Sequence, residues 1–203
     1  MNDYLDIRLR PDPEFQPALL MKALYSKLHR ALFDLETSDV GVSFPEHRVG
    51  VQVRTMGGHL RLHGTQQRLE QLMQTDWLTG MRDHVALGNI KQAPEDARHL
   101  VVKRRQFNTG SESRAKRYAK RNNVSVEEAR RIYQKLATRR IELPFVQLSS
   151  RSTQERFCLF IEHGEPQAEP ASGTFNHYGL SQYATVPWFG PFFSSEKRGI
   201  KNQ

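Results

Sequence analysis

Hydrophobic residues alternate with polar ones at the start of the chain and then change to a helical spacing. From Tyr4 to Arg10 every second residue is apolar, which predicts a strand with one buried face. Prolines follow this strand and end it, and Pro17 fits the first turn of a helix. Leucine and alanine then recur every three or four positions, so we predict a helix over residues 17–35.

The rest of the first half completes a β-α-β-β-α-β order. Gly57-Gly58 lies between two segments with apolar residues and indicates a β-hairpin. The predicted elements are a strand at 41–44, hairpin strands at 48–54 and 59–63, helical segments at 66–73 and 77–81, and a strand at 85–90. This order is typical of the ferredoxin-like fold, which is common among RNA-binding domains. We therefore predict an α+β protein whose N-terminal domain, residues 1–94, is ferredoxin-like (RRM-like).

A second α+β part is predicted after residue 94. Ser125 and Glu128 have the spacing of a capping box at a helix start, and Asn122-Asn123 separates this helix from the one before it. The predicted elements are a strand at 99–105, helices at 112–121 and from 126 up to Pro144, and strands at 145–148, 156–162, 175–179 and 186–189. We predict that residues 95–189 form this domain and that residues 190–203 are a flexible tail.

Positive charge is concentrated in one segment. Residues 103–140 contain thirteen lysines and arginines and three glutamates, a charge of +10, whereas the whole chain carries +8. The remainder of the chain is therefore slightly acidic. Such segregation indicates a surface for a polyanion.

The predicted helix at 112–121 is basic on one face. At 100 degrees per residue, five basic side chains fall within an arc of about 160 degrees: Arg114, Lys116, Arg117, Lys120 and Arg121. Ala115, Tyr118 and Ala119 fall on the other side. Nucleic-acid binding is the interpretation that we favour; a solvated surface helix and contact with an anionic membrane remain alternatives.

Composition and motifs argue against several functional classes. Cys158 is the only cysteine, which removes intrachain disulfides and multi-cysteine metal sites. The chain has no HExxH, DxD or P-loop motif, and His59 and His63 share a strand face without an obvious third ligand. We therefore expect no metal and no cofactor. The polar N-terminus and the absence of a long apolar run predict a cytoplasmic protein without a membrane partner.

Cleavage of RNA is possible without a metal ion, because the 2′-hydroxyl can attack the adjacent phosphate. This reaction needs a base with a pKa near neutrality, and histidine fits best. The candidates are His29, His47, His59, His63, His84, His99, His163 and His177. The pattern alone leaves the choice open, and His29, on the predicted helix, could equally be a histidine at the edge of the core.

A family resemblance narrows these alternatives. From Tyr4 to about Phe189 the sequence resembles the CRISPR repeat-processing endoribonucleases of type I-F systems. The matching stretches are Tyr4–Pro11, Lys27-Leu28-His29, Gly41–Pro45, Glu127–Arg130, Leu143–Val146, Tyr178–Ser181 and Val186–Phe189.

The resemblance implies the roles of three catalytic residues. His29 falls on the family's catalytic histidine, which would accept the proton of the 2′-hydroxyl. Ser150 falls on the active-site serine, which would orient that hydroxyl. Tyr178 would hold the histidine ring in place.

The resemblance also implies how the RNA is bound. Phe157 would stack on the base pair at the foot of the hairpin, and Arg104 and Gln106 would read the lowest purines. Ser152 and Thr153 would contact the neighbouring phosphate or nucleotide. The basic helix would lie in the major groove of the hairpin, although two lysines stand there in place of the family's arginines.

The function implied is that of a metal-independent endoribonuclease. It would bind the stem-loop of CRISPR repeat RNA, cleave at its 3′ base and leave a 2′,3′-cyclic phosphate. It would then stay on the mature guide RNA with the other subunits of the type I-F surveillance complex. A non-catalytic subunit that binds the hairpin is the main alternative, and a ferredoxin-like protein that binds DNA or ribosomal RNA non-specifically is a second.

Overall fold

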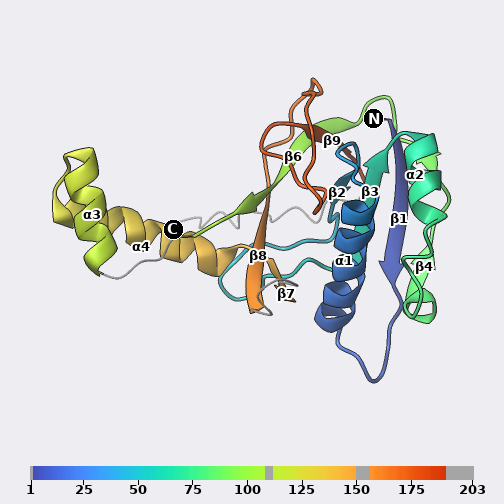
Figure 1. The fold of residues 1–203 in the computed structure, drawn as a ribbon, viewed down its shortest axis with the longest axis horizontal. Coiled ribbons are helices and arrows are strands. Elements are labelled where there is room, and N and C mark those ends of the chain that lie inside the picture. The colour runs from blue at the N-terminus through green and yellow to red at the C-terminus, as the bar shows by residue number, and fades with distance from the viewer. Residues whose placement is uncertain (1, 108–111, 150–155, 191–203) are drawn as a thin grey trace, which may run out of the picture.

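The computed structural model describes residues 2–107, 112–149 and 156–190, and within these it contains two antiparallel sheets and four α-helices (Figure 1). The predicted α+β class is therefore confirmed. Figure 1 shows the sheets side by side in one body, from which two of the helices project as an arm. The predicted tail at 190–203 lies almost wholly outside the described residues.

The first half of the chain builds the first sheet. Its strands lie in the order β2-β3-β1-β4, each antiparallel to its neighbour, and β5 also pairs with β1. The elements are β1 (Asp3–Leu9), α1 (Pro17–Asp34), β2 (Gly41–Ser43), β3 (His59–Gly64), α2 (Gln66–Met73), the 3-10 helix η1 (Arg82–His84), β4 (Val85–Leu87) and β5 (Lys91–Gln92). Both predicted long helices and the first strand are thus present.

Two predictions in this half are wrong. Residues 48–54 do not form a hairpin strand with 59–63, because β3 pairs with β1 and β2 and only an isolated bridge joins Arg48 to Thr55. The valines between them are 51–64% exposed, so their alternation reflects no buried face. Residues 77–81 form turns rather than a helix. Asp76 and Gly80 have φ values of 53° and 75°, which interrupt helical backbone.

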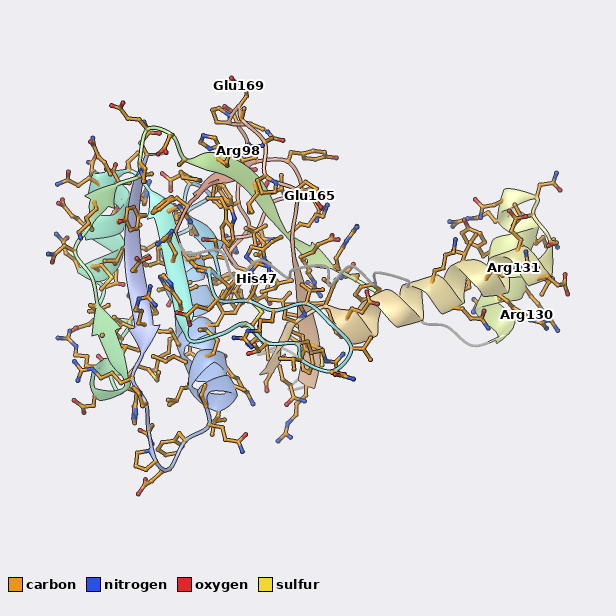
Figure 2. All side chains as sticks on the ribbon, turned by 180° about the vertical axis from the view of Figure 1, so that it is seen from behind. His47, Arg98, Arg130, Arg131, Glu165 and Glu169 are labelled. Atoms are coloured by element: carbon orange, nitrogen blue, oxygen red, sulfur yellow. The ribbon has the colours of Figure 1, made fainter. Side chains whose placement is uncertain are left out.

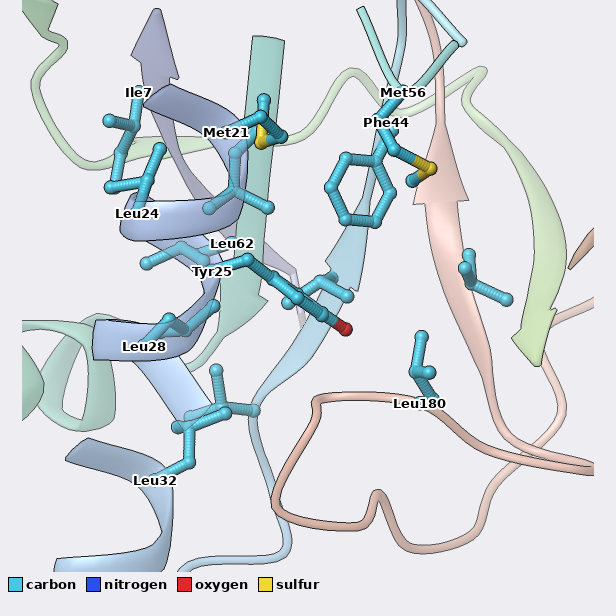
Figure 3. Packing of buried hydrophobic residues seen from close by; sticks show 14 of the residues in the cluster. Ile7, Met21, Leu24, Tyr25, Leu28, Leu32, Phe44, Met56, Leu62 and Leu180 are labelled. Atoms are coloured by element: carbon cyan, nitrogen blue, oxygen red, sulfur yellow. The ribbon is translucent and has the colours of Figure 1, made fainter. Parts of the chain in front are cut away.

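The long helix α1 buries its apolar stripe against the sheet. Leu24 and Leu28 are fully buried, and Ile7 and Leu62 meet them from β1 and β3 (Figure 3). The alternation of β1 therefore places its apolar residues under the helix. Tyr25 belongs to the same cluster, and its hydroxyl points away from α1 toward the segment that carries Leu180 (Figure 3).

The second sheet has the order β7-β8-β6-β9 and is also antiparallel. Its strands are β6 (Arg98–Arg105), β7 (Phe145–Ser149), β8 (Arg156–His163) and β9 (Thr185–Trp188). The main hydrophobic cluster contains residues from both sheets, so one core holds the two halves together. The strand predicted at 175–179 is wrong, because these residues form a turn.

An ion pair fastens the end of the second half to the first sheet. The Arg61 guanidinium binds both carboxylate oxygens of Asp6, at 2.6 and 3.1 Å, and donates to the Phe189 carbonyl at 2.9 Å. Its Cζ lies 4.7 Å from the centre of the Tyr4 ring and 4.0 Å from that of Phe189. Burial alone would raise the pKa of Asp6, but contacts with His59 and Arg61 outweigh it and hold this pKa far below its usual range.

The arm consists of α3 (Glu112–Asn122) and α4 (Val126–Glu142), which pack on each other. Ser125 caps α4 as predicted, since its Oγ accepts a hydrogen bond from the Glu128 amide at 3.0 Å. The contact between the two helices is a small cluster separate from the main core, made by Ala115, Ala119 and Ala129 with Tyr118, Val124, Val126 and Tyr133 around them. Figure 2 shows Arg130 and Arg131 near the end of the arm, far from the sheets.

Candidate active site and nucleic-acid interface

A histidine and a tyrosine from distant parts of the sequence stack at the centre of the candidate site. The rings of His29, on α1, and Tyr178 lie 3.9 Å apart at an angle of 12°. The Nδ1 atom of His29 lies 2.9 Å from the carbonyl oxygen of His177. A carbonyl can only accept, so Nδ1 carries the proton and the neutral ring has its lone pair on Nε2. The ring is thus fixed in both orientation and tautomer.

The segment that supplies these contacts is a tight turn. The Asn176 side-chain oxygen accepts hydrogen bonds from the amides of Tyr178 and Leu180, at 2.9 and 3.2 Å. Gly179 has a φ of +69°, and a Cβ there would lie 2.6 Å from a methyl group of Val42, so only glycine fits. The turn therefore presents the stacked ring and the carbonyl that holds His29.

A buried hydroxyl supports the turn from α1. The Tyr25 hydroxyl donates to the Tyr178 carbonyl at 2.6 Å, one helical turn before His29. Burial raises the pKa of Tyr25 well above its ordinary value, so this hydroxyl keeps its proton and remains a donor. Sequence reasoning missed Tyr25 and Asn176; the four-residue spacing between Tyr25 and His29 was the one available signal.

Arg104 connects this site with the aromatic ring on β8. Its Cζ lies 5.8 Å from the centre of the Phe157 ring, and its positive charge also acts on the Tyr178 hydroxyl. Burial raises the pKa of Tyr178 and outweighs the effect of Arg104, which lowers it. The tyrosine therefore stays neutral, and its contribution to His29 is the stacked ring.

A shallow depression of about 460 Å³ adjoins Phe157. Gln106 lies exposed at its edge, and Arg105 and Arg156 add positive charge to its lining. The predicted RNA-binding residues Arg104, Gln106 and Phe157 are thus gathered at one place.

The helix α3 presents its basic residues to solvent. Lys116, Arg117, Lys120 and Arg121 are exposed, whereas Ala115 and Ala119 are buried against α4. The predicted division of this helix into a basic and an apolar face agrees with this burial. The Arg114 side chain, together with Ser150, Ser152 and Thr153, lies outside what the structure describes.

Comparison with known proteins decides the family. The model of the family described as CRISPR-associated protein (Cas_Csy4) matches residues 4–189. The chain belongs to the Csy4 family. Two relatives, from Pseudomonas aeruginosa (strain UCBPP-PA14) and Escherichia coli (strain UTI89 / UPEC), are named CRISPR-associated endonuclease Cas6/Csy4. They are 42% and 40% identical to this chain over 189 residues, which cover 93% of it and the whole of each relative.

Membership of the Csy4 family confirms the resemblance inferred from the motifs. It also confirms the prediction that the chain is an enzyme of a CRISPR endonuclease family. Among the described residues no helix is long and apolar enough to span a membrane. In the same part of the chain, no three histidine, cysteine, aspartate or glutamate side chains are grouped as metal ligands.

Several other histidines of this Csy4 family member are held in the fold. His59 Nε2 lies 2.8 Å from an oxygen of Asp6, and His63 Nε2 lies 2.8 Å from the Ser43 hydroxyl. Burial lowers the pKa of His63 to about 3, so this ring is neutral. His163 is also buried, which lowers its pKa. The contacts of His59 and His63 account for the positions of these two rings.

Proposed function

We propose that this chain is a metal-independent endoribonuclease that processes CRISPR repeat RNA. It binds the stem-loop of the repeat, cleaves at its 3′ base and remains on the mature guide RNA with other subunits of the type I-F surveillance complex. The observation that carries the proposal is the His29 ring, fixed by the Tyr178 stack and the His177 carbonyl. A histidine held in one tautomer beside basic and aromatic side chains is suited to general-base catalysis on RNA.

The reaction begins with proton transfer to His29 Nε2 from the 2′-hydroxyl of the nucleotide before the cut. The 2′-oxygen then forms a bond to phosphorus as the bond from phosphorus to the 5′-oxygen breaks. The leaving oxygen takes up a proton and becomes a 5′-hydroxyl, and the other product ends in a 2′,3′-cyclic phosphate. In this scheme Ser150 orients the attacking hydroxyl, and Tyr178 keeps the base from rotating away.

The RNA hairpin is bound by two regions of the protein. Phe157 stacks on the base pair at its foot, while Arg104 and Gln106 contact the edges of the lowest purines; Ser152 and Thr153 contact the neighbouring phosphate or nucleotide. The support for this arrangement is the contact between Arg104 and Phe157 beside the depression edged by Gln106.

The arm supplies the second contact. Helix α3 lies in the hairpin's major groove through Arg114, Lys116, Arg117, Lys120 and Arg121. The two lysines are point charges without the guanidinium fork, so they contact phosphates rather than base edges. The exposure of the basic residues from Lys116 to Arg121 supports this role.

The proposed domain division follows from these roles. Residues 1–94 form the ferredoxin-like domain that carries His29, and residues 95–189 form the hairpin-binding domain. The β-α-β-β-α-β order with strands arranged β2-β3-β1-β4 supports a ferredoxin-like first domain.

The decisive experiment uses repeat RNA with and without a single 2′-deoxynucleotide immediately before the cut, in excess EDTA. We expect the all-RNA substrate to be cleaved to a 2′,3′-cyclic phosphate, and the deoxy substrate to bind with similar affinity but resist cleavage. Cleavage of the deoxy substrate would exclude attack by the 2′-hydroxyl, and a requirement for a divalent ion would exclude the metal-independent mechanism. Tight hairpin binding without cleavage in either buffer would favour the non-catalytic subunit.

Exchange of Arg117 and Arg121 for alanine tests the arm. We expect weaker hairpin binding. The slope of log affinity against log salt concentration should also fall by roughly one to two units, because each phosphate contact contributes about 0.7–0.9 to it. The matched control replaces Arg10 and Arg82, two exposed arginines of the first domain, and removes the same charge. Equal losses in both double variants, measured by fluorescence anisotropy at several salt concentrations, would mean that net charge alone attracts the RNA.

A further inference from the structure

An exposed aromatic side chain lies one helical turn beyond the candidate base. Phe33, in the last turn of α1, is 54% exposed although it is a large apolar residue. It follows His29 by four positions, which places it on the same helix face and about 6 Å further along the axis. Its ring meets the His177 ring edge-to-face, with centroids 5.1 Å apart. We call Phe33 and His177 the aromatic shelf.

The aromatic shelf is joined directly to the catalytic geometry. The carbonyl of His177 fixes Nδ1 of His29, while the side chain of the same residue supports Phe33. The exposed ring is therefore held at a defined place beside the reacting groups. An aromatic ring with a free face is a surface on which a nucleobase stacks, whatever its identity.

The shelf lies on the side of His29 away from the foot of the hairpin. The first turns of α1, with Ala18 and Leu19, line a cavity together with Phe145 and Val146 of β7. β7 in turn carries Leu148, which pairs with Phe157 on β8. Figure 1 agrees, because β7 and the start of β8 lie beside the first turns of α1 and not beside its last turn. His29 thus lies between Phe157 and Phe33 along the helix direction.

We infer that the aromatic shelf binds the base of the nucleotide immediately 3′ of the scissile phosphate. This inference rests on the proposed function, because it extends the RNA path past the cut. The 5′-oxygen of that nucleotide is the leaving group, so stacking of its base on Phe33 holds this oxygen opposite the attacking 2′-oxygen. Phe33 acts as a binding and positioning residue for the leaving strand.

The test compares Phe33→Ala with the wild type on two precursor RNAs. One carries the natural downstream nucleotides, and the other has an abasic site directly after the cut. We expect Phe33→Ala to lower kcat/KM on the natural precursor by roughly 5- to 150-fold, the range of one base stack. On the abasic precursor the two proteins should cleave at the same rate. Phe33→Tyr should resemble wild type, and Leu19→Ala, which truncates another exposed residue of α1, should have no effect.

A second measurement separates this inference from the proposed function. An RNA with 2-aminopurine directly after the cut and a 2′-deoxynucleotide before it reports stacking without being cleaved. Its fluorescence should be quenched on binding to the wild type and to Leu19→Ala, but not to Phe33→Ala.

The outcomes are distinct. Equal quenching by wild type and Phe33→Ala would refute the proposal that the aromatic shelf binds this base. An equal loss of cleavage by Phe33→Ala on the natural and the abasic precursors would refute it as well. Quenching that depends on Phe33 in a protein that cleaves neither precursor would support the shelf and refute the nuclease mechanism.

Discussion

Replacement of His29 by alanine is expected to slow cleavage of the repeat RNA by about 10²- to 10⁴-fold, the usual contribution of a general base. The fixed tautomer leaves Nε2 as the basic nitrogen, and alanine offers no substitute. Affinity for the product hairpin should change little, because the groups proposed to hold the hairpin itself lie on the second domain. Single-turnover rates with excess protein, together with anisotropy on the product hairpin, measure the two quantities separately.

His84→Ala is the matched control for that variant. His84 pairs with Asp12 at 2.9 Å, belongs to η1 and takes no part in the candidate site. We expect its cleavage rate to stay near that of the wild type. If His29→Ala retained more than a tenth of the rate, the base would be another group; if it lost hairpin binding while remaining folded, His29 would belong to the binding surface.

Asp6→Ala is expected to lower the free energy of unfolding by about 3–5 kcal/mol, because it leaves the buried Arg61 charge without its partner. The Arg61 side chain is only 6% exposed, and Asp6 supplies both of its carboxylate contacts. The pair also fastens the Phe189 carbonyl to the first sheet, so its loss should loosen the attachment of the second half. Urea unfolding followed by circular dichroism measures the effect.

Arg82→Ala provides the comparison, because it removes a surface ion pair without placing alanine at Asp76, whose φ of 53° disfavours it. Asp76 pairs with Arg82 at the surface, where the side chains are 74% and 68% exposed, and such pairs contribute less than about 1 kcal/mol. Asp6→Ala combined with Arg61→Met should recover part of the lost stability, since no unpaired charge is then buried. An equally small loss for Asp6→Ala and Arg82→Ala would show that water solvates Arg61 in the folded protein.

Elements with a clear periodicity of hydrophobic residues were predictable from the sequence. The alternation of β1 and the leucine spacing of α1 gave both elements nearly to the residue, because each buries one face against the core. The strand predicted at 48–54 is absent because its alternating valines remain exposed and therefore bury no face against the core. At 175–179 the apolar and aromatic residues imitate a strand, but the Asn176 side chain binds the backbone amides and forms a turn.

Local sequence patterns predicted less of the candidate site. His29 was one of eight histidines, and the family resemblance chose it. Its stacking partner Tyr178 is 149 positions away, and no periodicity relates residues at that distance. Tyr25 and Asn176 act through backbone carbonyls and amides, which carry no side-chain signature in a sequence.

The small core of the arm has a thermodynamic consequence. Three alanines form the buried contact between α3 and α4, and so little apolar area stabilises the packing of the helices only weakly. The basic residues of α3 repel one another, which lowers that stability further until phosphates neutralise them. Under the proposed function, local unfolding of the arm and RNA binding are therefore linked equilibria, and ordering of the arm offsets part of the favourable phosphate interaction. A substitution that loosens Ala119 against α4 is then expected to weaken the complex without touching the RNA.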